Sequence, residues 1–545
     1  MLKKNLIAPL TSFLFTLFLL PIGTALATAN NPEITDKDNP LSLEFHRLAV
    51  RRFIFSNNIN LCEFVPSEIV SFESMHPSFS LSHNNKAQQD TLFTPILHKG
   101  RLLLNKKCNA PHTSIYIGGV NPYATYEIDI ESITYENKPI EIGIEFARLG
   151  LRDRIQVIAI RKETNTQFAI RRYKEGKIIK VDDLGTHSIT GPFILRTQLY
   201  GRSLGVFIAQ HQETHYIGHI NYNDHFGDVL DLRKSSIAKN STFNIVSNLE
   251  GEVVINKASS YLSPGIGQAD IRLISYEDLS PYLEDNRLWF TFSCRGMHTS
   301  QSVQGVLSLD PSVFDVQFEG MIVFDHEDGL IRNDYASHLF YDRQTKEWRA
   351  YACDFGGSAN IEGRTGSGLV TAYSIKDPRR GFSVMKATRV ENNQVEGHNE
   401  DPCIYYNKED NKWHLLTSAF VDGNITSRTY VSDSWNGKFT PITPPIQTNS
   451  TGTSIQKVGN THYAFMGGHG NLRVHSYPEL QELGELNLDL QPHWPKPAGR
   501  IWASLVPLPN GYPYKYILLT MDRPNFPGIK EKNWTYGALY FFGSY

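Results

Sequence analysis

Short segments of alternating apolar and polar residues follow one another from about residue 92 to residue 261. Examples are residues 125–130 (TYEIDI), 140–146 (IEIGIEF) and 204–209 (LGVFIA), and turn-forming residues separate them. Alternation with period two over many short segments, with no helical stretch between them, is typical of antiparallel strands. The pattern therefore predicts a β-sandwich over residues 92–262.

The preceding segment has a different pattern. Residues 82–90 are polar and rich in turn formers, and four apolar residues follow one another at roughly helical spacing: Leu41, Phe45, Leu48 and Phe53. We expect residues 28–91 to form a lead segment that is partly helical or irregular, followed by a loop.

Beyond Pro264 one pattern recurs five times. Each unit has a polar start, an apolar strand, a turn that carries Asp, Asn or Gly, and a second strand. The units begin near residues 270, 334, 400, 452 and 502. This period suits four-stranded blades with loops, and period-two strands exclude helical repeats. The sequence therefore predicts an all-β chain, with a sandwich followed by a five-bladed β-propeller over residues 263–545.

The first residues have the pattern of a secretory signal. Lys3 and Lys4 precede an apolar stretch from Leu6 to Ile22, and small residues surround Ala27. The alternative is a membrane anchor, but the stretch is short for a spanning helix and contains two prolines. We expect residues 1–27 to be removed and the mature protein to be secreted, periplasmic or extracellular, without a membrane anchor.

Composition narrows the class of partner. The formal net charge of −3 argues against a polyanion binder, so nucleic acid is not an expected partner. The five cysteines are scattered and odd in number, which excludes a disulfide framework and offers no zinc spacing. We expect a monomer with no cofactor, and a structural cation such as calcium in the propeller channel is an alternative.

The starts of the propeller units carry the candidate chemistry. In a propeller the first strand of each blade lines a central channel, so equivalent positions face one space. Asp270, Asp334 and Glu400, with Asp401 beside it, give three successive blades a carboxylate. Carboxylates held close together cannot all stay ionised, so one is expected to keep its proton and act as a general acid. An ionised partner can activate water, which is what glycoside hydrolysis requires.

Five units with acids on the first three resemble the five-bladed propeller glycosidases, namely the arabinanase and β-xylosidase group of glycoside hydrolase family 43 and the related invertases and levansucrases. The resemblance implies that Asp270 is the base or nucleophile, Asp334 an orienting residue and Glu400 the acid, with Asp401 the alternative acid. The strand order from Gly191 to Gly218 is similar to the laminin-G and concanavalin-type sandwiches that accompany carbohydrate enzymes.

Further residues near the expected channel are candidates for substrate binding. Guanidinium groups there could bind a carboxylate or sulfate of an anionic sugar, or could instead form salt bridges between blades. The candidates are Arg272, Arg295, Arg332, His338, His398, Asp401, Arg500 and Trp502. The sequence thus favours a glycosidase acting on a carbohydrate. A propeller polysaccharide lyase and a non-catalytic glycan-binding propeller remain the alternatives.

Overall fold

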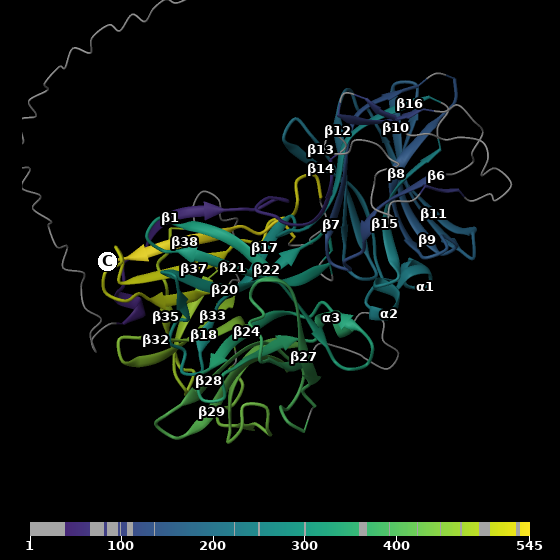
Figure 1. Cartoon of the computed structure of the whole chain (residues 1–545). Coiled ribbons are helices and arrows are strands. Elements are labelled where there is room, and N and C mark those ends of the chain that lie inside the picture. Colours follow the sequence, from purple (N-terminus) through teal and green to yellow (C-terminus); the bar gives the residue numbers. More distant parts are fainter. Residues whose placement is uncertain are drawn as a thin grey trace, which may run out of the picture.

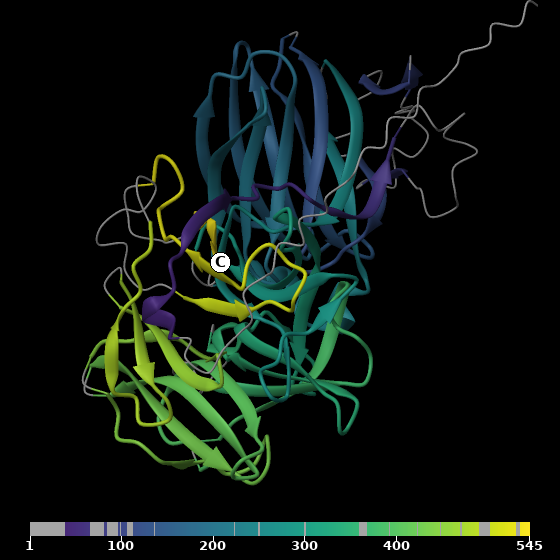
Figure 2. The same cartoon turned by 90° about the vertical axis from the view of Figure 1, so that its left-hand side faces the viewer.

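The computed structural model shows two bodies of β-sheet packed against each other (Figures 1 and 2). The expected signal peptide, residues 1–27, lies outside the described residues. The structure describes the chain from Asn39 onwards, apart from residues 66–80, 84–95, 99, 106–112, 136, 223, 249–250, 299–300, 359–367, 392, 422, 447, 469–470, 490–501 and 530–534.

The first body is a sandwich of two antiparallel sheets. One sheet has the order β11 (Lys177–His187), β10 (Asn165–Lys174), β9 (Arg154–Lys162), β8 (Ile140–Arg148), β15 (Ser241–Asn248), β6 (Thr113–Gly119) and β3 (Leu81–His83). The other has the order β14 (Glu213–Ile220), β13 (Leu204–Gln210), β12 (Phe193–Leu199), β7 (Thr125–Thr134), β16 (Glu252–Leu262), β5 (Arg101–Asn105) and β4 (Ile96–His98), and β2 (Ile59–Phe64) also pairs with β16. Two short helices, α1 (Phe226–Leu230) and α2 (Ser235–Ala238), precede β15.

The alternation along these strands explains the two layers. Successive side chains of a strand point to opposite faces. Ile142, Ile144 and Phe146 of β8 therefore share one face, and all three are buried between the sheets. The ring of Tyr126 on β7 meets Phe146 and Phe243 edge-to-face, with centroids 4.9 Å away in both cases. These contacts join the two sheets across an apolar core.

The second body consists of five four-stranded units, which we call blades one to five. Blades one and two are joined by parallel pairing of their outer strands, β22 (Asp315–Asp325) and β27 (Gly381–Arg389). Short elements, β18 (Ser275–Tyr276), β19 (Leu283–Glu284), β23 (Ile331–Arg332) and α3 (Phe355–Ser358), lie in or beside these two blades.

The strands of each blade are given from inner to outer. Blade one has β17 (Gly267–Leu273), β20 (Arg287–Arg295), β21 (Ser302–Asp310) and β22 (Asp315–Asp325). Blade two has β24 (Tyr335–Asp342), β25 (Glu347–Cys353), β26 (Leu369–Ser374) and β27 (Gly381–Arg389). Blade three has β28 (Asn399–Asn407), β29 (Lys412–Val421), β30 (Asn424–Ser432) and β31 (Thr440–Pro441). Blade four has β32 (Thr451–Val458), β33 (Thr461–Gly468), β34 (Asn471–Ser476) and β35 (Glu482–Glu485). Blade five has β36 (Ser504–Pro507), β37 (Tyr516–Met521), β38 (Leu539–Ser544) and β1 (His46–Arg51).

The inner strands close a ring. Strand β17 contacts β24, β24 contacts β28, β28 contacts β32, β32 contacts β36, and β36 returns to β17. Five antiparallel blades around one axis form a propeller. The expected fold class, an all-β sandwich followed by a five-bladed propeller, is therefore confirmed.

The lead segment differs from the sequence-based expectation. The helical spacing of Leu41, Phe45, Leu48 and Phe53 does not form an α-helix: one turn of 3₁₀-helix, η1 (Pro40–Ser42), is followed by strand β1, which pairs antiparallel with β38. Phe45, just before β1, is buried with Tyr540 and Phe542 of β38. A free strand edge in blade five offers backbone partners that outweigh the weak helical spacing of a short segment.

The sandwich and the propeller share direct contacts. The hydroxyl of Tyr123 donates to the carbonyl of Ile331 at 2.6 Å, and the backbone N–H of Ile331 donates to the carbonyl of Arg233 at 2.7 Å. One continuous group of buried apolar side chains extends from the sandwich into blades one and five. Among the described residues, none of the helices has the length and apolar composition needed to cross a membrane.

Candidate active site

The inner strands of blades one to four share a backbone irregularity near their starts. In each, the pairing register with the second strand shifts around one residue that has a positive φ. These residues are Asp270 (φ 56°), Ala336 (57°), Asp401 (56°) and Gly452 (63°). Bulges of this kind redirect side chains, and strained backbone gathers at functional sites. Because the register shift and the positive φ recur at the same point of each inner strand, the four residues occupy equivalent positions around the ring.

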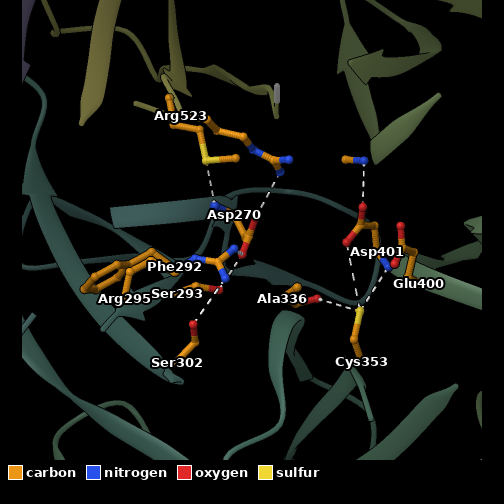
Figure 3. A network of polar contacts seen from close by, with 12 residues as sticks. Asp270, Phe292, Ser293, Arg295, Ser302, Ala336, Cys353, Glu400, Asp401 and Arg523 are labelled. Carbon is orange, nitrogen blue, oxygen red and sulfur yellow. Dashed lines mark hydrogen bonds and ion pairs between the residues drawn. The ribbon is translucent and has the colours of Figure 1, made fainter. Parts of the chain in front are cut away.

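This equivalence differs from the one expected from the sequence. Blades one and three supply a carboxylate at the bulge, Asp270 and Asp401, whereas blade two supplies the methyl group of Ala336 and blade four supplies Gly452. Figure 3 shows the two carboxylates on either side of Ala336, with Arg523 close to Asp270. We call Asp270 and Asp401 the carboxyl pair.

Asp270 lies among cationic and hydroxyl donors. Its Oδ2 accepts hydrogen bonds from Ser293 Oγ at 2.6 Å and from Arg295 Nη2 at 2.8 Å (Figure 3). Arg523 Nη2 lies 3.6 Å from its Oδ1. The side chain is only 4% exposed. Two guanidinium groups thus compensate the negative charge of a buried carboxylate, which is the condition under which a buried charge is tolerated.

Asp401 is also buried, but its hydrogen bonds come from neutral donors. Its Oδ2 accepts from Thr451 Oγ1 at 2.5 Å and from the backbone N–H of Gly452 at 2.8 Å. Burial raises the pKa of this carboxyl, and the negative charge of Asp270 raises it further. The bonds from Thr451 and Gly452, together with the charge of Arg272, act in the opposite direction on this pKa. The carboxyl pair therefore contains one carboxylate paired with cations and one carboxyl whose pKa is raised.

The backbone N–H of each carboxyl-pair residue donates a hydrogen bond to a sulfur atom. Asp270 N–H donates to Met521 Sδ at 2.8 Å, and Asp401 N–H donates to Cys353 Sγ at 3.1 Å. Met521 and Cys353 each end the second strand of the preceding blade. Cys353 Sγ also lies 3.9 Å from Asp401 Oδ1, and burial raises the pKa of its thiol, with the charges of Asp401 and Glu400 adding to this. Cys353 is therefore a neutral thiol beside the carboxyl of Asp401.

Glu400 lies beside the carboxyl pair and is half-buried. Thr451 Oγ1 is 3.4 Å from Glu400 Oε1 and also reaches Asp401 Oδ2. Strict alternation would send the two acids to opposite faces of β28, and the bulge at Asp401 removes that alternation. One hydroxyl can therefore contact both side chains.

Asp334 is not a member of the bulge series. It precedes Ala336 by two residues and is fully buried. Its Oδ2 is 3.1 Å from His326 Nε2, and its Oδ1 accepts from the backbone N–H of Gly356 at 3.0 Å. These partners belong to the segments after β22 and β25, so the carboxylate connects a loop of blade one to a loop of blade two through these contacts.

The remaining predicted residues are dispersed. Arg295 contacts Asp270. Arg272 donates to the carbonyl of Thr453 at 2.6 Å and lies over the buried ring of Trp502, 4.6 Å from its centroid. His338 lies within the ring of inner strands, where its Nδ1 accepts a hydrogen bond from Ile404 N–H at 3.1 Å. Arg332 forms an ion pair with Asp328. His398 is exposed. Arg500 falls outside the described residues.

Several site residues were missed by the sequence reasoning: Ser293, Cys353, Arg523 and the backbone N–H of Gly452. Cys353 ends the second strand of its blade, and Ser293 and Arg523 lie within two residues of such an end, but only the ring geometry brings them to one point. In the part of the chain that the structure describes, no group of three or more His, Cys, Asp or Glu side chains has a metal-binding arrangement.

Comparison with family models and with curated sequences finds no match. Among solved structures, the chain is similar to Zg3597, a family 117 glycoside hydrolase of the marine bacterium Zobellia galactanivorans (10% identity, TM-score 0.35, covering 51% of this chain and 84% of that one). The catalytic domain of a GH62 α-L-arabinofuranosidase of Coprinopsis cinerea aligns similarly (11% identity, TM-score 0.33, 51% and 91%). A legume lectin-like domain of Entamoeba histolytica aligns over 34% of this chain and 90% of its own (9% identity, TM-score 0.24). Likeness at these identities and TM-scores assigns no activity to the chain.

Proposed function

We propose that the protein is a secreted glycoside hydrolase whose reacting groups are the carboxyl pair, with Asp401 as the general acid and Asp270 as the general base or nucleophile. One observation carries the proposal: two carboxyl groups from different blades meet in opposite electrostatic surroundings. Asp270 is paired with Arg295, whereas burial and its neighbour raise the pKa of Asp401. When two neighbouring carboxyl groups have such different environments, the environments indicate which group acts as the acid and which as the base.

The chemistry follows from this division. Asp401 would protonate the oxygen of the leaving sugar, while Asp270 would either activate a water molecule or attack the anomeric carbon. Ser293 and Arg295 hold the carboxylate of Asp270 in one orientation. In this proposal Asp401 replaces Glu400 as the acid, because Asp401 is the more deeply buried of the two.

The test of the activity is release of reducing ends from a panel of plant, algal and host glycans by the full chain. We expect hydrolysis of at least one glycan, with products that carry no new double bond. Products that absorb as unsaturated uronates would identify a lyase instead. Saturable binding of a panel glycan without any turnover would support the non-catalytic alternative and contradict the proposal.

Replacing Cys353 by Ser is expected to move the alkaline limb of the pH profile of kcat/KM to lower pH, by about one pH unit. That limb reports loss of the proton from the general acid. A hydroxyl donates a stronger hydrogen bond to a carboxylate than a thiol does, so Ser stabilises ionised Asp401 and lowers its pKa. The measurement is kcat/KM against pH on the best substrate of the panel.

The matched control for this experiment is Cys353→Ala, which also removes the thiol but adds no hydroxyl donor. It is expected to leave the alkaline limb at the wild-type pH or above it. Identical limbs for the Ser and Ala variants would contradict contact between residue 353 and the acid.

A further inference from the structure

The outer face of the seven-stranded sheet of the sandwich contains a pocket of about 540 Å³. Its residues come from β8, β9, β10, β11 and β15. They alternate with the side chains that fill the sandwich core: Ile155 and Val157 of β9 point inward, whereas Gln156 and Ile158 line the pocket. Figure 1 shows this sheet as the layer farther from the propeller. The volume lies within the usual range for small-ligand sites.

The charged groups of the pocket are already paired. Arg171 donates through both Nη1 and Nη2 to the two carboxylate oxygens of Glu141, each at 2.7 Å. Arg154 donates to the carbonyl of Leu151 at 2.5 Å, and its Nε lies 3.4 Å from Glu145 Oε2. The pocket therefore presents fixed polar groups without an unbalanced charge, which disfavours an ionic ligand.

Apolar side chains form the floor and one rim. Ile158 and Val246 are buried in the floor, 1% and 4% exposed. Ile178 and Val181 on β11 line the same pocket and are 52% and 50% exposed. An apolar surface rimmed by polar groups is a feature of ligand-binding grooves.

The polar part of the pocket is preorganised. Gln156, 2% exposed, donates to Glu145 Oε2 at 2.8 Å, and Ser114 Oγ donates to Glu145 Oε1 at 2.6 Å. Glu145 is fully buried. The guanidinium of Arg154 lies over the ring of Tyr173, 3.8 Å from its centroid, and this contact restricts both side chains. A ligand would therefore meet polar groups that need little reordering, which favours affinity.

We infer that this pocket binds a neutral oligosaccharide. A sugar hydroxyl donates and accepts at once, and the Arg171–Glu141 pair presents a donor and an acceptor side by side. The C–H face of a sugar ring matches the apolar floor and the β11 rim, where burial of apolar surface contributes to binding. The inference uses only residues of the sandwich, so it does not depend on hydrolysis by the propeller.

The test is calorimetric titration of the full chain carrying Asp270→Asn, which prevents turnover, with neutral hexasaccharides of β-1,4-glucan, β-1,4-xylan, β-1,4-mannan and β-1,3-glucan. At least one should bind, and Val181→Asp should weaken that binding at least tenfold. Ile179→Asp is the matched control: Ile179 lies on the same strand, is 44% exposed and does not line the pocket. It should bind like the parent.

Three outcomes would overturn the inference. These are no binding of any hexasaccharide, equal weakening by both Asp variants, and tighter binding of an oligogalacturonate than of every neutral sugar. Binding that depends on Val181 in a protein whose wild type hydrolyses no glycan would uphold this inference while the proposed hydrolase fails. The two proposals can therefore fail separately.

Discussion

Replacing Asp401 by Asn is expected to lower kcat by about 10² to 10⁴-fold, the usual contribution of a general acid. The amide keeps the size of the carboxyl and can still accept the hydrogen bond from Gly452 N–H. It cannot deliver a proton to the leaving oxygen. Asp270→Asn should cause a loss of the same order, because the amide can neither take a proton from water nor attack the sugar. The measurement is kcat on the best glycan of the panel.

Two variants serve as controls. Glu400→Gln should reduce kcat less than tenfold, because Glu400 lies beside the carboxyl pair and is more exposed. Asp334→Asn should affect stability more than turnover, because its carboxylate fastens loops. A loss at Glu400 that exceeds the loss at Asp401 would contradict the assignment of the acid.

The stability of Asp401→Asn separates a catalytic role from a structural one. Folding raises the pKa of Asp401, so the folded state binds its proton more tightly than the unfolded state. Ionisation of Asp401 then disfavours the folded state, and this effect is complete above the folded pKa and disappears below the unfolded value near 4. The Asn variant should therefore match or exceed the wild-type Tm at pH 8 and lose that advantage in acid.

Replacing Phe45 by Ala is expected to lower the free energy of unfolding by about 3–5 kcal/mol, as for other buried Phe to Ala changes. Phe45 is 7% exposed and lies with side chains of blades four and five, among them Phe465 and Tyr540. Its loss leaves a cavity at the point where β1 joins β38. Urea titration followed by intrinsic fluorescence measures the change.

His46 provides the comparison, because it is the next residue and its side chain is exposed. His46→Ala should change the free energy of unfolding by less than about 0.5 kcal/mol. Equal, small effects of the two substitutions would show that β1 does not hold the fifth blade together.

The fold could be predicted from the sequence because its signals are local. Period-two alternation marks the strands of the sandwich, and the recurring unit beyond Pro264 marks the blades. Strand β1 could not be predicted in this way. Six residues with weak helical spacing form a strand only because β38, at the other end of the described chain, offers an unpaired edge.

The site could be predicted only in part. The sequence repeat predicts Asp270, Asp334 and Glu400 as equivalent positions, whereas the bulge series in the structure consists of Asp270, Ala336, Asp401 and Gly452. The alignment depends on which residue of each inner strand adopts a positive φ. Asp and Gly adopt this conformation readily, so Asp270, Asp401 and Gly452 fit it. Ala336 fits it poorly, and nothing in its neighbourhood in the sequence distinguishes it from Asp334.

The fifth blade combines strands from both ends of the described chain, and this has a consequence for assembly. The strands of the sandwich, and those of each of blades one to four, come from one continuous part of the sequence, whereas β1 pairs with β38 from the other end of the described chain. During synthesis the emerging β1 segment has no sheet to join until residues 539–544 have been made. The ring can therefore close only as a last event, and premature termination would release chains with an unprotected strand edge prone to association.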